Sequence, residues 1–66
     1  MTLGVYTKQN GTNEIFWESD VSWERVSKVL IDYFNQVDWR EDEQDDTIYR
    51  GYIRGEKNPV LMAQVW

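Results

Sequence analysis

Cysteine and histidine are both absent from the 66 residues of this chain. Without cysteine the chain can form neither a disulfide nor a thiolate metal site, and it has no cysteine nucleophile. Without histidine it lacks the side chain that most often acts as a general base or a zinc ligand. We therefore expect no metal and no cofactor, and the lack of cysteine fits a reducing compartment.

Long hydrophobic runs are absent as well. No apolar run approaches the ~20 residues that a helix needs to cross a bilayer. Residues 1–6 lack the basic and apolar regions of a signal peptide. These two observations predict a cytoplasmic protein that does not contact a membrane.

The chain is also too short for most enzyme folds. Its 66 residues predict one domain, residues 1–66, with little room for the concave, partly dry site that catalysis requires. Glycine motifs for binding phosphate are missing. The spacing of Asp42, Gln44 and Asp46 lacks the glycine and the closing glutamate of an EF-hand. We expect a non-enzymatic protein with no catalytic residue.

Negative charge is abundant and concentrated in one segment. Twelve acidic and seven basic residues give a net charge of −5, and residues 38–46 alone also sum to −5. Such a run is typical of a solvated loop, or it docks a basic partner. Its carboxylates average ~5 Å apart in an extended chain, close to the ~3.4 Å charge spacing of one DNA strand, so docking includes mimicry of nucleic acid. The acidic residues of this predicted loop are Asp38, Glu41, Asp42, Glu43, Asp45 and Asp46.

A β-hairpin is predicted at the start of the chain. Residues 2–8 alternate between two faces and are rich in strand formers, and residues 13–18 return as a second strand. The pair Asn10-Gly11 between them tolerates the positive φ angles of a type I′ turn.

A helix is predicted next, at residues 22–37. Its apolar residues recur at steps of three and four, as on the buried stripe of an α-helix. Asp20 or Ser22 can cap the first turn, and Glu24 lies four residues before Lys28, an arrangement that supports a helix. The stripe consists of Trp23, Val26, Val29, Leu30, Tyr33, Phe34 and Val37.

A second pair of strands is predicted at residues 47–54 and 60–66. The first of these alternates between two faces, and a turn that contains Pro59 joins it to the second. Residues 60–66 are almost continuously apolar, broken only by Gln64. Such a run is typical of a central strand that is covered on both faces.

These elements predict an α+β fold, a ββαββ two-layer sandwich in which one helix covers one face of a four-stranded sheet. Right-handed crossovers and the apolar character of residues 60–66 favour the strand order 2-1-4-3, with the first and last strands parallel. In element order and size this layout resembles the β-grasp of small immunoglobulin-binding domains, a resemblance that carries no function with it. The alternative is a fully antiparallel sheet in the order 2-1-3-4.

The sheet face without a helix is the candidate binding surface. We expect Leu61, Ala63 and Val65 beneath the helix because they are small and aliphatic. The uncovered face then carries aromatic residues, methionine and arginine, which are enriched in interface cores. Mutual shielding of arginine stems and aromatic rings is the other interpretation. The predicted site residues on this face are Arg50, Tyr52, Arg54, Met62 and Trp66.

The sequence thus predicts a small acidic protein-protein interaction module that regulates or inhibits a larger partner through the uncovered face, the acidic segment or both. Its most specific form is an inhibitor of a basic, nucleic-acid-handling protein, of the kind that phages and bacterial immunity systems make. The other candidate protein partner is a second copy of the chain, bound through the uncovered face to form a homodimer. The competing prediction is a single-stranded nucleic-acid binder that uses Tyr49 or Tyr52 with Arg50 and Arg54. The net charge of −5 argues against it.

Overall fold

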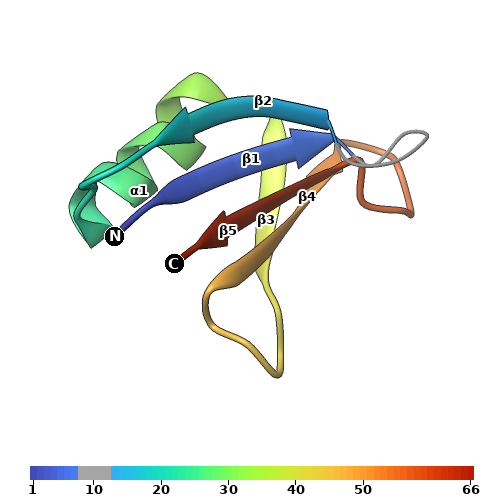
Figure 1. Ribbon diagram of the computed structural model, residues 1–66. Helices are drawn as coiled ribbons and strands as arrows, with labels where there is room; N and C mark the ends of the chain where they lie inside the picture. The colour runs from blue at the N-terminus through green and yellow to red at the C-terminus, as the bar shows by residue number, and fades with distance from the viewer. Residues whose placement is uncertain (8–12) are drawn as a thin grey trace.

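The computed structural model describes residues 1–7 and 13–66, which form one strongly twisted antiparallel sheet and a short helical segment (Figure 1). The predicted Asn10-Gly11 turn lies outside the described residues. Along the sheet the strands follow the order β2-β1-β5-β4-β3. The elements are, in chain order, β1 (Leu3–Thr7), β2 (Asn13–Glu18), α1 (Trp23–Lys28), the π-helical segment η1 (Val29–Tyr33), β3 (Val37–Glu41), β4 (Ile48–Ile53) and β5 (Leu61–Val65).

The predicted four-stranded α+β sandwich is wrong, because the described chain is mainly β and has a fifth strand at the sheet edge. β3 consists of residues that we assigned to the end of the helix and to the acidic loop. This extra strand reverses the chain once more before β4, so β5 runs antiparallel to β1 and not parallel to it. Neither the β-grasp-like order 2-1-4-3 nor the alternative 2-1-3-4 describes the sheet.

The helical segment is shorter than predicted. It begins after Ser22, whose hydroxyl accepts a hydrogen bond from the backbone N–H of Arg25 at 3.1 Å. From Val29 the turns widen, and the N–H of Phe34 bonds the carbonyl of Val29, five residues earlier, at 3.4 Å. Phe34 then leaves the helical conformation, with φ −114° and ψ 47°. Val37, which fits the apolar stripe of a longer helix, instead begins β3.

Trp39 holds β3 against the helical segment. Its indole Nε1 donates a hydrogen bond to the carbonyl of Leu30 at 3.0 Å, and its ring meets Phe34 edge-on with centroids 5.9 Å apart. Phe34 also meets Phe16 of β2 edge-on, at 6.3 Å. One ring of the helical side therefore contacts rings from both edge strands, so the sheet curves around the helix. Figure 1 shows the result, with β3 turned far out of the direction of β2.

The hydrophobic core lies between the helical segment and the central strands. The predicted stripe is confirmed for Val26, Val29 and Leu30, which are buried, whereas Trp23 and Tyr33 remain exposed. The predicted helix-facing side of the last strand is also confirmed, because Ala63 and Val65 are buried and Leu61 is half-buried. Among the described residues, the buried core consists of Leu3, Val5, Val21, Val26, Val29, Leu30, Ala63 and Val65.

Candidate functional site

The candidate site is the face of the sheet that points away from α1. Its side chains alternate along the strands with the core residues, and the strand registers align them across the sheet. Met62 of β5, for example, lies between Tyr6 of β1 and Arg50 of β4. We use the name open face for this surface, whose aromatic and apolar members are Tyr6, Trp17, Ile48, Tyr52, Met62 and Trp66.

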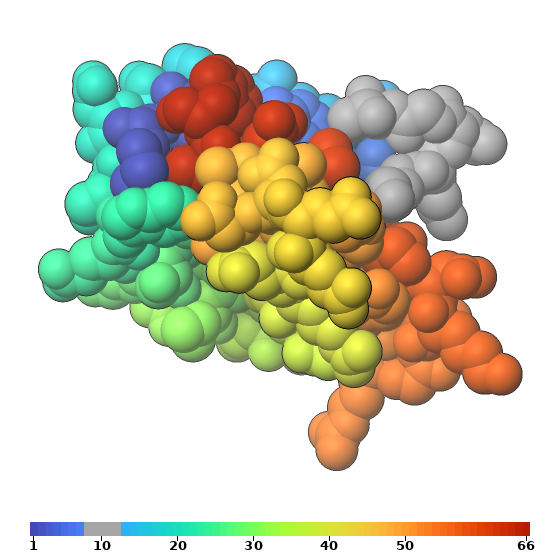
Figure 2. Space-filling view, turned by 90° about the horizontal axis from the view of Figure 1, so that it is seen from below, coloured from blue at the N-terminus to red at the C-terminus, as the bar shows by residue number. Residues whose placement is uncertain are grey.

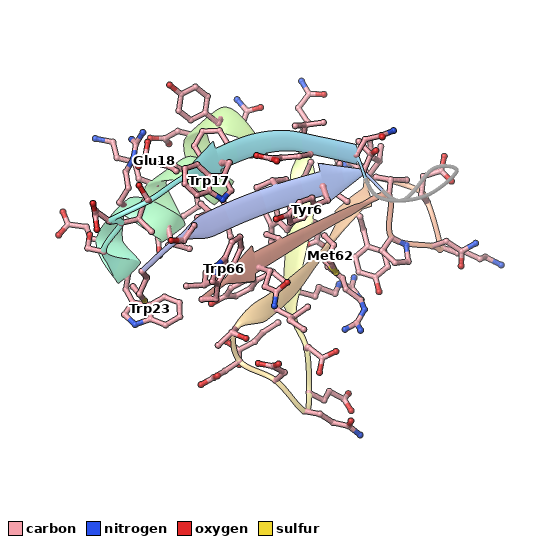
Figure 3. All side chains as sticks on the ribbon, in the orientation of Figure 1. Tyr6, Trp17, Glu18, Trp23, Met62 and Trp66 are labelled. Carbon is pink, nitrogen blue, oxygen red and sulfur yellow. The ribbon has the colours of Figure 1, made fainter. Side chains whose placement is uncertain are left out.

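Tyr6 lies flat against the open face. A Cβ atom added to Gly4 would come within 2.8 Å of Cζ and 2.9 Å of Cε2 of the Tyr6 ring, so the ring occupies the space above this glycine. Gly4 is buried for this reason, although it belongs to the outer face of the sheet. Because Trp17 is the cross-strand neighbour of Gly4, the rings of Tyr6 and Trp17 lie on adjacent strands over the same part of the sheet (Figure 3).

Three tryptophans reach solvent at the end of the sheet where β1 begins and β5 finishes (Figure 3). Trp66 exchanges two backbone hydrogen bonds with Thr2, which extends the pairing of β1 and β5 by one residue pair. The N–H of Val21 bonds the carbonyl of Met1 and so brings the start of α1, with Trp23, to this end. Trp17, the second-last residue of β2, completes the group.

The two arginines of the open face are neutralised within the chain. Arg50 donates a hydrogen bond to the carboxylate of Asp42, and Arg40 pairs with Asp38 at 3.2 Å. The bond from Arg50 is the main reason why the pKa of Asp42 lies below its usual value. Arg40 also lies over the Tyr52 ring, with its guanidinium carbon 5.0 Å from the ring centre. Over β3 and β4, Arg40 therefore shields the Tyr52 ring of the open face.

The turn between β3 and β4 is built by two aspartates of the acidic segment. Asp42 accepts hydrogen bonds from the backbone N–H groups of Gln44 at 2.8 Å and Asp45 at 3.0 Å. Asp45 accepts from the N–H and from Oγ1 of Thr47, at 2.9 and 2.5 Å. Carboxylates that bond the backbone two or three residues ahead are typical turn formers. These two residues therefore have a structural role that the solvated-loop interpretation did not include.

The predicted loop at residues 38–46 is wrong for its first part, because residues 38–41 belong to β3. They were assigned to a loop because they belong to a run of acidic charge, which is typical of solvated loops. The remaining acidic residues differ from Asp42 and Asp45. Among the described residues of the acidic segment, the exposed carboxylates of Glu41, Glu43 and Asp46 make no hydrogen bond or ion pair.

Replacing both turn aspartates, as Asp42→Asn with Asp45→Asn, should lower the melting temperature at neutral pH. Hydrogen bonds hold the pKa of each carboxyl below its ordinary value, Asp42 chiefly through Arg50 and Asp45 chiefly through the Thr47 hydroxyl. A lowered pKa stabilises the fold above the unfolded pKa of about 3.9, and this stabilisation is lost as the pH falls through the folded value. The double variant should therefore melt with a weaker pH dependence in the acid range.

Thermal melts followed by circular dichroism between neutral and strongly acidic pH measure this effect. The matched control is Glu41→Gln with Glu43→Gln, which removes the same charge from carboxylates that take no part in the turn. The control should keep the acid dependence of the wild type. Equal pH profiles for the two double variants would contradict the assignment of Asp42 and Asp45 to the turn.

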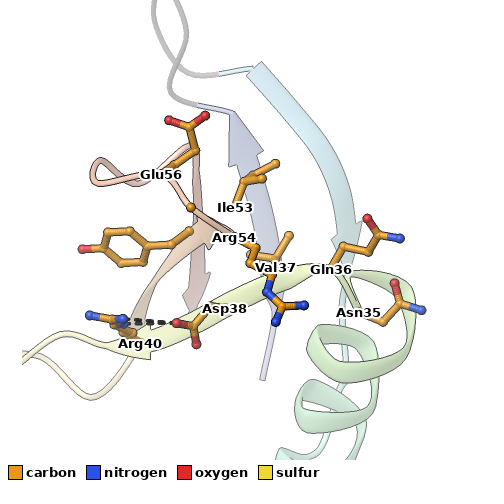
Figure 4. A pocket seen from close by; sticks show the side chains of 10 residues that line it. Asn35, Gln36, Val37, Asp38, Arg40, Ile53, Arg54 and Glu56 are labelled. Atoms are coloured by element: carbon orange, nitrogen blue, oxygen red, sulfur yellow. Dashed lines mark hydrogen bonds and ion pairs between the residues drawn. The ribbon is translucent and has the colours of Figure 1, made fainter.

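A cleft of about 910 Å³ lies where β3 begins and β4 ends (Figure 4). Arg54 lines it from the turn after β4, together with Asn35 and Gln36 from the segment before β3. Because β4 and β5 are antiparallel, Arg54 and Trp66 lie at opposite ends of the sheet. The structure therefore separates these two members of the predicted site.

The described carboxyl groups with shifted pKa values do not favour acid catalysis. The pKa is lowered in Glu18, Asp42 and Asp45, chiefly by hydrogen bonds from Arg25, Arg50 and Thr47. A general acid needs a raised pKa, so that it holds a proton near neutral pH. In residues 1–7 and 13–66 no group of three or more acidic side chains is placed to hold a metal ion.

The open face includes residues that we did not select from the sequence. The predicted Met62, Tyr52 and Arg50 lie on it, but Tyr6 and Trp17 were missed. Their signal was the alternation of each strand, since Tyr6 lies between core-type positions and Trp17 follows the inward-facing Phe16.

Comparisons with known proteins add no further assignment. No protein-family model, no curated protein and no solved structure matches the chain. In its described part, the protein has no helix with the length and apolar character needed to cross a membrane.

Proposed function

We propose that this chain is a non-enzymatic protein-protein interaction module that regulates or inhibits a larger protein bound to its open face. The main support is that Trp17 and Trp66, 52% and 56% exposed, lie on this face together with Tyr6 and Met62. Aromatic residues and methionine are enriched in interface cores, and a contiguous exposed apolar patch is typical of a surface that a partner covers. The expected compartment is the cytoplasm, because a chain without cysteine suits reducing conditions.

The binding region within the open face is the part formed by β2, β1 and β5. Over β4, Arg40 already covers Tyr52, so that ring is shielded by its own chain. Single-stranded nucleic acid is less well supported as the ligand. Phosphate binding needs surplus cations, but Arg40 and Arg50 are paired with carboxylates.

The proposal is tested with the double variant Tyr6→Ala, Trp17→Ala. Affinity capture from cells that produce the protein should retain a specific protein on the wild-type chain and lose it on the variant. Each truncated anchor costs about 2 kcal/mol in a typical hot spot, which is a roughly 30-fold weaker Kd. Binding of the captured protein is then measured by calorimetry, after circular dichroism shows that the variant is folded.

The matched control is Ile31→Ser, which removes an apolar side chain of η1 that is 66% exposed. It should retain the partner as well as the wild type does. Equal capture by the wild type and the folded double variant would overturn the assignment of the open face, and loss of capture by Ile31→Ser would place the partner on the helical side.

A further inference from the structure

The charge of the molecule is concentrated beside the open face. Residues 37–53, which form β3, β4 and their connection, contain six acidic residues and two arginines, so they carry most of the net charge of −5. Both arginines are paired, with Asp38 and Asp42. The unpaired charge of residues 37–53 is therefore negative, and it resides on the exposed carboxylates of Glu41, Glu43 and Asp46.

The connection between β3 and β4, residues 42–47, lies at the end of the sheet where Trp66 is found, and we call it the acidic connection. The N–H of Val65 donates to the carbonyl of Thr47 at 2.8 Å, so β5 ends against the start of β4. Asp46 and Trp66 are the chain neighbours of these two residues and lie at the same end of the sheet. Figure 2 shows the last residues of the chain (red) against the β3–β4 connection (yellow to light orange). An indole at the same end of the sheet as exposed carboxylates suits a partner's arginine or lysine side chain, which both groups attract.

We propose that the occupant of the open face is a cationic segment of a partner protein, in which lysine or arginine residues flank an apolar residue. This inference rests on the proposed function and adds the chemistry of the partner. The apolar residue covers Tyr6 and Met62, while the basic residues lie over Trp66 and reach the carboxylates of Glu43 and Asp46. The open face supplies the buried contact, and the acidic connection selects the charge of the partner.

The negative charge of this surface favours a cationic segment over a second copy of the chain or nucleic acid. A second copy of the chain would bring another net charge of −5 to the same surface, and nucleic acid would bring phosphates. A cationic segment alone complements the exposed carboxylates. Because these carboxylates are exposed, their attraction is screened over about 10 Å at 0.1 M salt. The complex should therefore weaken as salt is added, and it should do so mainly through slower association.

The experiment selects random linear peptides, displayed on phage, against the immobilised full chain. The selected peptides should be rich in lysine and arginine next to aliphatic or aromatic residues. A synthetic peptide of the most enriched sequence is then titrated by fluorescence anisotropy at several salt concentrations. Trp66→Ala should weaken its binding about 30-fold. The triple variant Glu41→Gln, Glu43→Gln, Asp46→Asn should weaken it roughly tenfold and flatten its salt dependence.

The matched control is the triple variant Asp20→Asn, Glu24→Gln, Asp32→Asn, which removes the same charge from exposed residues next to and within the helical segment. It should bind the peptide as the wild type does. Equal loss in both triple variants would show that only net charge matters and would overturn the proposal.

The remaining outcomes separate the partner chemistry from the proposed function. Neutral or acidic peptides that still require Trp66 would overturn the cationic partner and leave the open face as a protein-binding surface. Peptides that bind equally well to Trp66→Ala and to Tyr6→Ala, Trp17→Ala, or the absence of any enriched peptide, would overturn both. Self-association in sedimentation, or salt-sensitive binding of labelled single-stranded DNA, would assign the open face to a second copy or to nucleic acid.

Discussion

The variant Val26→Asp should be largely unfolded at room temperature. Val26 is 2% exposed and packs in the core, and no described basic side chain is buried there to pair with a new carboxylate. An unpaired buried charge commonly costs several kcal/mol. A domain of 66 residues has a total stability of only about 3 to 10 kcal/mol. Far-ultraviolet circular dichroism and a urea titration measure the loss.

The matched control is Ile31→Asp, which places the same charge on the same helical segment at a residue that is 66% exposed. This variant should unfold within about 0.5 kcal/mol of the wild type, as exposed substitutions do. A cooperative, wild-type-like unfolding curve for Val26→Asp would refute the packing of the helical segment on the sheet.

Removing the Trp39 side chain should cost nearly as much. The substitution Trp39→Ala deletes the ring that meets Phe34, the donor to the Leu30 carbonyl and the group that packs over Gly51. Truncation of a packed tryptophan typically costs 3–5 kcal/mol, so we expect a loss of about that size in a urea titration.

Two further substitutions show where this loss comes from. Trp39→Phe keeps an aromatic ring and removes the indole donor, so it should lose about 1 kcal/mol for the hydrogen bond. Trp66→Ala truncates a tryptophan that is 56% exposed and should change stability little. If Trp39→Ala were as stable as Trp66→Ala, Trp39 would not be holding β3 against the helical segment.

Local patterns predicted the four strands that have strong strand formers, and they failed where two periods overlap. Val37 continues the helical spacing from Phe34, and it also begins the alternation with Trp39 that defines β3. The sequence alone does not show which period applies. In the structure the choice depends on contacts between distant residues, the bond from Trp39 to Leu30 and the packing of Trp39 on Phe34. Because β3 was missed, the first and last strands were predicted to be parallel, whereas β1 and β5 are antiparallel.

The candidate site could be predicted in part for the same reason. Met62 and Tyr52 were placed on the outer face because alternation along a strand fixes the face of a side chain. Arg54 follows the last residue of β4, Ile53, so strand alternation does not fix the face on which its side chain lies. The ion pairs of the two arginines could not be predicted, because they depend on how the β3–β4 hairpin folds. The hairpin brings Asp42 to Arg50, and Asp38 pairs with Arg40.

The two edges of the sheet carry features that oppose aggregation by strand pairing. An edge strand offers unpaired backbone groups to which an identical strand can add, and charges or bulges prevent this. β3 carries Asp38, Arg40 and Glu41 along its short length. On β2 the register shifts opposite Val5 and Tyr6, which interrupts the regular backbone edge. Fibril-like growth by strand addition is thus opposed at both edges of the sheet.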